Sequence, residues 1–326
     1  MRALVAGTIS LDLLAASATS TEATATVGST GANIAIRLAA KGWRVELVGL
    51  VGNDEPGRLV RAELEAWGVD TSRVTVRAGT YTPIVYQVSG VPGDPFLRRC
   101  PRCHRPQARH ELPSEDELAE QGARSSDLSF AVIDCGGEAL SRIVGEARER
   151  SALLWVEFSP LRNSEPIGRD ILESAWVVKT SEEDAPLLDD APVCGWVTHQ
   201  GPVLSIVTLG ERGVRVRRSG VGEPWKTYSA ARLQGPPIDP IGAGDAFTAA
   251  CLDGFASLGT PFSSSSTPLD GVLVAALREA AAVVTVAGAN GDLVRPSGAS
   301  PRVVPFACYD CNRSHFGSSG PEDQRS

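Results

Sequence analysis

The apolar positions of this chain follow two patterns that alternate along most of its length. Short continuous apolar runs predict buried strands, whereas apolar residues three or four apart predict helices. The strands are expected at 3–9, 44–52, 128–136, 152–158, 175–180 and 203–210, and the helices at 31–43, 55–69, 138–150, 166–174 and from 244 onward. Strands that alternate with helices in this way predict an α/β fold in three layers, with a central mostly parallel sheet covered on both faces.

Three segments interrupt this alternation. Residues 74–90 are rich in strand-forming residues with no intervening helix, which predicts a small antiparallel sheet projecting from the main domain. Residues 91–113 are rich in Pro and Arg and are expected to form an irregular insertion. The main domain is expected to cover residues 1–305, and the tail at 306–326 is expected to be disordered because it has no periodicity.

Composition narrows the classes of partner. The chain has 326 residues, of which 42% are hydrophobic, and a formal net charge of −8, so it lacks the basic footprint of a nucleic-acid-binding protein. It also lacks an apolar run of the roughly 18 residues needed to span a membrane. The cysteine count is odd, at seven, and Cys135, Cys194 and Cys251 lie in apolar segments. These features favour reduced thiols, a cytoplasmic location and a small-molecule or protein partner.

The first twenty residues superficially imitate a secretory signal peptide, with one Arg, an apolar run and small residues after it. Asp12 interrupts the apolar run, and a first strand over RALVAGTISLDLL accounts for the same residues. We therefore interpret this segment as part of the fold.

The segment DPIGAGDAF at 239–247 carries the clearest chemical signal. After Gly244 the apolar residues Phe247 and Cys251 are four apart, so the small residues at 242–244 stand at the start of a helix. The first N–H groups of a helix lack partners and favour anions, and small residues let a phosphate approach them. Asp245, in the first turn, is placed to take a proton from a hydroxyl, although an aspartate there also acts as a simple helix cap.

The wider sequence resembles the ribokinase (PfkB) family of carbohydrate and nucleoside kinases. DPIGAGDAF is similar to that family's C-terminal signature D-T-x-G-A-G-D-x-F, and GSTGANIA, which begins at Gly28, is similar to its N-terminal Gly-Gly segment. The stretches GTISLDLL, VGNDEPG, VTLGERGV and VVTVAGANG also resemble family segments, in the family's order, so that the similarity covers about residues 1–300. The resemblance implies a ribokinase-like α/β/α sandwich with a small β lid, at 74–90 in this chain, that closes over the acceptor.

The resemblance also implies roles for individual residues. Asp245 matches the catalytic base, and Gly242, Ala243 and Gly244 match the anion hole. The expected acceptor-binding residues are Asp12, Gly28, Ser29 and Asn33, and the expected nucleotide-binding residues are Thr208, Gly210, Gly213 and Asn290. The implied cofactors are ATP and Mg²⁺, with Asp184 as an indirect Mg²⁺ ligand, and K⁺ held near Asp239.

Several positions depart from the family pattern. Ser29 replaces the second glycine of the N-terminal signature, and Pro240 replaces the threonine that usually follows Asp239. KTSEED at 179–184 stands where N-x-x-E is common, so that Ser181 and Asp184 would supply the oxygen atoms around Mg²⁺. EFSPLRN at 157–163 cannot be aligned securely, and we assign Glu157 no role from the sequence.

The cysteines leave a separate question open. Cys100 and Cys103 form one Cys-x-x-Cys pair, and Cys308 and Cys311 form another. Two such pairs can bind zinc, but they are about 200 residues apart, which favours incidental surface cysteines. A redox-sensitive pair at 100 and 103 is a further alternative, because the arginines at 98, 99 and 102 favour thiolates.

The sequence therefore predicts ATP-dependent phosphorylation of a hydroxymethyl group on a sugar or ribosyl compound. The alternative is a kinase-like protein that binds a ligand or partner but transfers no phosphate, which Ser181, Asp184 and Pro240 would favour. Exposed strand edges in the lid also suggest a homodimer. The sequence does not identify the acceptor.

Overall fold

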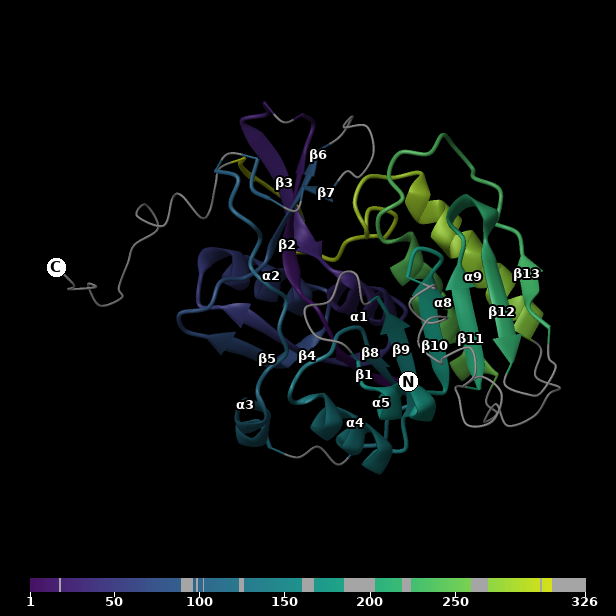
Figure 1. Cartoon of the computed structure of the whole chain (residues 1–326). Coiled ribbons are helices and arrows are strands. Elements are labelled where there is room, and N and C mark those ends of the chain that lie inside the picture. The colour runs from purple at the N-terminus through teal and green to yellow at the C-terminus, as the bar shows by residue number, and fades with distance from the viewer. Residues whose placement is uncertain are drawn as a thin grey trace.

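A nine-stranded sheet forms the centre of the protein (Figure 1). The computed structural model describes residues 1–17, 19–88, 96–97, 99–101, 103–122, 126–159, 167–184, 203–218, 224–258, 269–299 and 301–306. The strand order is β13-β12-β11-β10-β9-β8-β1-β4-β5. The bounds are β1 Arg2–Ala6, β4 Arg44–Gly52, β5 Asp70–Arg77, β8 Phe130–Ile133, β9 Leu153–Phe158, β10 Val177–Ser181, β11 Leu204–Thr208, β12 Val214–Arg218 and β13 Lys226–Tyr228. Strands β11 to β5 run parallel and only β12 and β13 pair antiparallel, which confirms the mostly parallel sheet.

Helices cover both faces of this sheet, as the hydrophobic pattern predicts. Strand β1 shows the reason, because Ala3 and Val5 join one hydrophobic cluster while Leu4 and Ala6 join another on the opposite face. The first cluster takes in α1, α2, α8 and α9, and the second takes in α4 and α5. The helix bounds are α1 Thr30–Ala40, α2 Glu55–Ala66, α3 Glu115–Glu120, α4 Leu140–Glu149, α5 Arg169–Ser174, α8 Ala243–Ser257 and α9 Leu269–Val284.

A second sheet of five strands stands beside the carboxyl ends of the central strands (Figure 1). Its order is β14-β3-β2-β6-β7, with bounds β2 Ser10–Ala15, β3 Glu22–Gly28, β6 Ile84–Val88, β7 Phe96–Leu97 and β14 Arg302–Pro305. Strands β2 and β6 pair parallel, so the sheet is mixed.

The position of this second sheet corrects the expectation that it lies mainly at 74–90. Residues 74–77 belong to β5, which pairs with β4 at the edge of the central sheet, and only β6 of that segment enters the second sheet. The longest strands of the second sheet are β2 and β3, both before residue 30. The continuous first strand is also wrong, because the chain passes from one sheet to the other between β1 and β2, at Gly7–Ile9.

The structure describes only parts of two segments that the sequence singles out, the insertion at 91–113 and the C-terminal tail. Within 91–113, the described residues include β7 and an isolated bridge between Arg99 and Pro106. Phe306 closes the second sheet, since its N–H donates to the Thr21 carbonyl and its ring packs edge-on against Tyr86. The rest of the tail, which the sequence predicts to be disordered, lies outside the described residues. Within the described ranges, no helix combines the length and apolar character that crossing a membrane requires.

Candidate active site

The segment that carries the chemical signal forms the start of α8, as expected. Gly242 caps the helix with a φ of 79°. A side chain there would be strained and would place its Cβ 2.5 Å from Ala289, so the site requires glycine. Ala243 and Gly244 open the first turn, whose N–H groups have no acceptor within the helix, and the Ala243 N–H instead donates to the Pro240 carbonyl at 3.3 Å. The arrangement favours an anion at this end of α8.

Asp245 lies in the same turn and is only 9% exposed. Its Oδ2 atom accepts a 2.8 Å hydrogen bond from Asn33 Nδ2, and Asn33 Oδ1 in turn accepts a 3.0 Å bond from Asn290 Nδ2. Burial raises the pKa of Asp245, while the charge of Lys179 and the bond from Asn33 oppose that rise. The bond from Asn33 fixes the orientation of the carboxylate, and the two asparagines connect α1 and the 286–291 loop to the same group.

Asp12 occupies a second buried polar position, on β2. Ser10 Oγ donates to Asp12 Oδ1 at 2.7 Å, and Gln87 Nε2 on β6 donates to Oδ2 at 3.0 Å. Gly28 packs directly on this carboxylate, since a Cβ at Gly28 would lie 2.0 Å from it. The pKa of Asp12 is raised to about 7, mainly by burial and further by the nearby charge of Asp245, while the bond from Ser10 opposes the rise. The two carboxylates therefore lie close enough to interact.

Ser29 links this carboxylate group to the start of α1. It is the N-cap residue, with a φ of 72° and a ψ of 154°, a conformation that residues other than glycine rarely adopt. Its hydroxyl donates to Ser10 Oγ at 2.8 Å, and Ser10 donates to Asp12. The extra hydroxyl that the sequence places here is thus part of the Asp12 hydrogen-bond chain.

The predicted nucleotide-binding residues lie at the end of β11 and in the turn that follows. Thr208 ends β11 and its hydroxyl donates to the Thr180 carbonyl at 3.3 Å. Gly210 begins a short 3₁₀ helix with a φ of 58°. A Cβ at Gly213 would lie 2.1 Å from the Tyr228 carbonyl, so this glycine allows β12 to pack closely beside β13. Asn290, the fourth predicted residue, is joined instead to Asn33.

The two predicted metal-associated carboxylates are held by neighbouring groups. Asp184 Oδ2 accepts a 2.9 Å bond from the Ser181 hydroxyl, just after β10. Asp239 Oδ1 accepts from the Ile241 N–H and Oδ2 from the Gly288 N–H, both at 3.0 Å. Asp239 therefore joins the loop before α8 to the 286–291 loop.

Sequence reasoning missed four polar residues that support the site. Lys179 and Glu157 form a buried ion pair of 2.6 Å beneath α8, and Ser10 and Gln87 bind Asp12. A signal for the pair was present, because each charge interrupts an apolar strand and a buried charge needs a partner. Ser10 and Gln87 carried no comparable signal.

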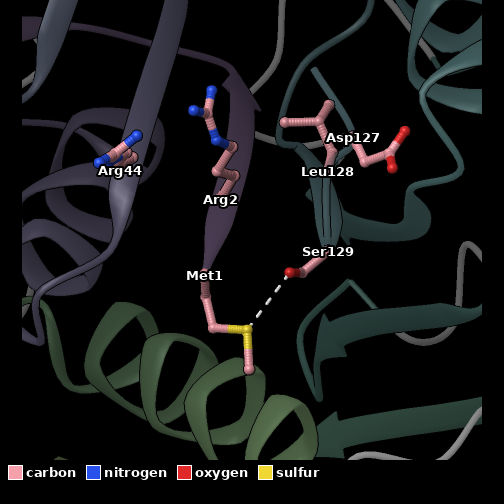
Figure 2. Close-up of a pocket in the computed structure, with 6 residues that line it drawn as sticks. All are labelled: Met1, Arg2, Arg44, Asp127, Leu128 and Ser129. Atoms are coloured by element: carbon pink, nitrogen blue, oxygen red, sulfur yellow. Dashed lines mark hydrogen bonds between the residues drawn. The ribbon is translucent and has the colours of Figure 1, made fainter.

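Other candidate sites receive less support. A pocket lined by Met1, Arg2, Arg44, Asp127, Leu128 and Ser129 lies at the amino ends of the parallel strands (Figure 2). Ligands of open α/β sheets bind at the carboxyl ends, where Thr208 and Ser181 lie. Cys100 and Cys103 are not joined in a disulfide, and Cys308 and Cys311 lie outside the described residues. Within the described ranges no cluster of His, Cys, Asp and Glu side chains could hold a metal ion.

Comparisons with known proteins identify the family of the chain. The family model described as pfkB family carbohydrate kinase matches residues 7–295. The chain is 27% identical to a probable fructokinase-4 of Arabidopsis thaliana over 69% of its own length and 72% of that protein. It is 27% identical to a fructokinase of Escherichia coli over 80% of its own length and 87% of that protein.

Solved structures share the fold. The aminoimidazole riboside kinase of Salmonella enterica, solved with aminoimidazole riboside and an ATP analogue, superposes with a TM-score of 0.67 at 18% identity. The superposition covers 91% of this chain and 97% of that one. Ribokinase of Arabidopsis thaliana, solved with ribose and ATP, gives a TM-score of 0.66 at 18% identity, over 89% and 95% of the two chains. The fold is therefore ribokinase-like, and the match of the family model over nearly the whole chain shows that the protein belongs to the pfkB family of carbohydrate kinases, as the sequence motifs predict.

Proposed function

We propose that the protein transfers the γ-phosphoryl group of ATP to a hydroxymethyl group of a sugar or ribosyl compound, with Asp245 as the base. The observation that carries this proposal is the position of the Asp245 carboxylate. It is buried in the first turn of α8, where the N–H groups have no acceptor within the helix itself, and is oriented by Asn33. A proton acceptor beside an anion-binding helix end is the arrangement that attack of a hydroxyl on a phosphate requires.

The start of α8 and the group around Asp12 have different parts in the proposed reaction. Asp245 takes the proton of the acceptor hydroxyl, and the N–H groups of the first turn stabilise the charge that develops on the transferred group. Asp12 binds other hydroxyl groups of the acceptor, together with Asn33 and the turn at Gly28 and Ser29. Closure of the second sheet over the acceptor would exclude water, which otherwise competes as a phosphoryl acceptor.

The acceptor class follows from the relatives. The curated relatives named above are fructokinases, and the structural neighbours bind aminoimidazole riboside or ribose. These compounds share a furanose-type ring with hydroxyl groups and a hydroxymethyl group. A buried carboxylate such as Asp12 suits the recognition of vicinal hydroxyls, since it can accept more than one hydrogen bond.

The nucleotide side of the proposal involves Thr208, Gly210, Gly213 and Asn290 around ATP. The oxygen donors after β10 suit a hard cation, so Asp184 would hold Mg²⁺ through water. When bound, Mg²⁺ neutralises charge on the phosphates. K⁺ near Asp239 is also part of the proposal, although the same carboxylate already accepts two backbone N–H groups.

The proposal extends to location and assembly. Cys135 and Cys251 are buried and form no disulfide, which is typical of a reducing compartment and supports a cytoplasmic location. Strand β14 is an edge of the second sheet, and Val303 on it is 69% exposed, which supports a homodimer through this sheet. A small-molecule acceptor, rather than a nucleic acid or a membrane, is the expected partner.

An acceptor panel tests the proposed function. The release of ADP from Mg·ATP is measured with D-fructose, D-ribose, inosine and aminoimidazole riboside, each against a blank without acceptor. Turnover that depends on one of these compounds supports the kinase and names its acceptor. Nucleotide binding without any acceptor-dependent turnover would instead support the non-catalytic alternative.

A further inference from the structure

A buried ion pair lies under the start of α8 and has no part in the proposed chemistry so far. Lys179 on β10 and Glu157 on β9 are each 5% exposed. They are direct neighbours in the parallel register of the two strands, and Lys179 Nζ lies 2.6 Å from Glu157 Oε2. The pair therefore sits on the face of the sheet that α8 covers.

Both members of the pair also bind α8 itself. Lys179 Nζ donates to the Gly244 carbonyl at 3.2 Å, and the Thr248 hydroxyl donates to Glu157 Oε1 at 2.5 Å. Trp155 Nε1 completes the group with a 2.7 Å bond to the same oxygen of Glu157. These bonds fix the first turn of α8 to β9 and β10 on either side of Asp245.

Stability alone gives a weak reason for such a pair. Burial of two charges costs free energy, and replacement of a buried ion pair by apolar residues is often neutral or stabilising. The contacts of this pair are concentrated on residues 244 and 248, which flank the proposed base. The position of the ion pair therefore points to a role in placing the groups that take part in the reaction.

We infer that Lys179 and Glu157 are positioning residues, which hold Asp245 and the anion-binding N–H groups of α8 in register with each other. The part of this inference that concerns the reaction rests on the proposed function. The part that concerns the position of α8 can be tested without that function. Lys179 reaches the acceptor only through α8, so we do not place it among the groups that touch substrate.

The pair also sets the charge around Asp245. Among the charged groups that act on this carboxylate, Lys179 lowers its pKa and Glu157 raises it, with Lys179 the stronger of the two. Arg37, on α1, lowers it as well, and Asp12 faces it from β2. Loss of both charges at 179 and 157 should therefore raise the pKa of Asp245.

The test compares two double variants in the full chain. Lys179→Met with Glu157→Gln removes both charges but keeps an acceptor for Thr248 and Trp155. The matched control is Arg73→Met with Glu146→Gln, which removes another ion pair, of 2.8 Å, between β5 and α4, together with the 3.0 Å pair of Glu146 with Arg150. The rate is measured from pH 5 to 9 with Mg·ATP and the acceptor from the panel above. Hydrogen exchange is followed by mass spectrometry for peptides that cover 241–252.

The first variant should lower kcat at least about tenfold and change the KM for ATP less than about threefold, because misplaced groups slow the chemical step. The acid limb of kcat/KM should move to higher pH, because the charge that lowers the pKa of Asp245 most strongly is gone. Residues 241–252 should exchange faster than in wild type. Lys179→Arg, which keeps the charge, should restore the pH profile, and the control variant should leave all of these quantities unchanged.

Equal kcat, pH profile and exchange in the two double variants would overturn the inference. If wild type transfers phosphate to no acceptor, the proposed function fails, and exchange of 241–252 alone decides the inference. Faster exchange than in the control would then support it, and unchanged exchange would refute it. Should the double variant fail to fold, Thr248→Val, which removes only the bond between Glu157 and α8, is measured in the same way.

Discussion

Ser29 combines an unfavourable backbone conformation with a useful hydroxyl. Its φ of 72° costs on the order of 1–3 kcal/mol for a residue with a side chain, whereas its bond to Ser10 contributes about 1 kcal/mol. We expect Ser29→Gly to be at least as stable as wild type and Ser29→Ala to be less stable, because alanine keeps the strain and loses the bond. Thermal unfolding measures both, and equal losses in the two variants would contradict this account.

Asp12 should make stability depend on pH. Burial raises its pKa in the folded state from 3.8 to about 7, so the folded protein holds a proton that the unfolded chain releases. Stability should therefore fall as the pH rises from about 4 to about 7, by up to on the order of 4 kcal/mol, and then level off.

Asp12→Asn provides the control for this prediction. It removes the titrating group, and Gln87 can turn its amide to accept from the new asparagine. Tm measured between pH 4 and pH 8 should lose most of its slope in this variant. A wild-type slope that persists in Asp12→Asn would show that another group is responsible.

At the scale of residues, the sequence predicted local motifs but did not predict contacts between residues far apart in the chain. Asp245 and Gly242 could be recognised because helix periodicity, small residues and an acid all occur within residues 242–251. The bond between Asn33 and Asp245 spans 212 positions, and no periodicity in either segment encodes it. Lys179 and Glu157 could have been recognised as buried charges, although their neighbouring register depends on the strand order.

At the scale of elements, Asp54 joins three pieces of the fold. Its Oδ1 atom caps α2 through the Gly57 N–H at 2.9 Å, and both of its oxygens bind Thr82, just before β6. The Thr82 hydroxyl also accepts from Gly52 at the end of β4. One carboxylate thus connects the central sheet, α2 and the entry to the second sheet.

Asp54→Ala should lower the free energy of unfolding by about 2–4 kcal/mol, because it removes the cap and leaves the buried Thr82 N–H without a partner. Asp54→Asn keeps one acceptor oxygen and should lose roughly half as much. Urea unfolding of the three proteins checks the order. Asp54→Ala with wild-type stability would mean that other contacts hold these elements together.

The elements that pattern reasoning located well are those of the central sheet. Strand β4 has the predicted bounds, 44–52, because its apolar run is long and is followed by a clear capping aspartate. Strand β3 was not predicted, since EATATVG offers only small residues and weak alternation. The apolar run from β1 into β2 concealed the change of sheet, because both strands are buried.

At the scale of the whole molecule, strand β14 leaves an edge of the second sheet unpaired within the described chain. We expect a homodimer through this edge, with a mass in light scattering of twice that of the chain. Val303→Lys, which places a charge on the exposed edge, should shift the protein toward the monomer. A wild-type monomer at concentrations of tens of micromolar would contradict this expectation.

The three-layer architecture could be predicted as a whole because the same hydrophobic pattern recurs in the strands of the central sheet. Continuous apolar strands need cover on both faces, and helices of matching length supply it. The second sheet depends on pairing between β2, β3, β6 and the distant β14, and these pairings are set by the completed fold. Its location was accordingly the largest error of the prediction.

The central claim is that Asp245 is the base of a phosphotransferase. The most direct measurement is the rate of phosphate transfer from Mg·ATP to the preferred acceptor by wild type, Asp245→Asn and Asp253→Asn. Asp253 lies on the same helix but binds Trp43, so it controls for the substitution itself. We predict a loss of at least about a thousandfold for Asp245→Asn, with ADP affinity retained, and a near wild-type rate for Asp253→Asn. A rate for Asp245→Asn within tenfold of wild type would contradict the account.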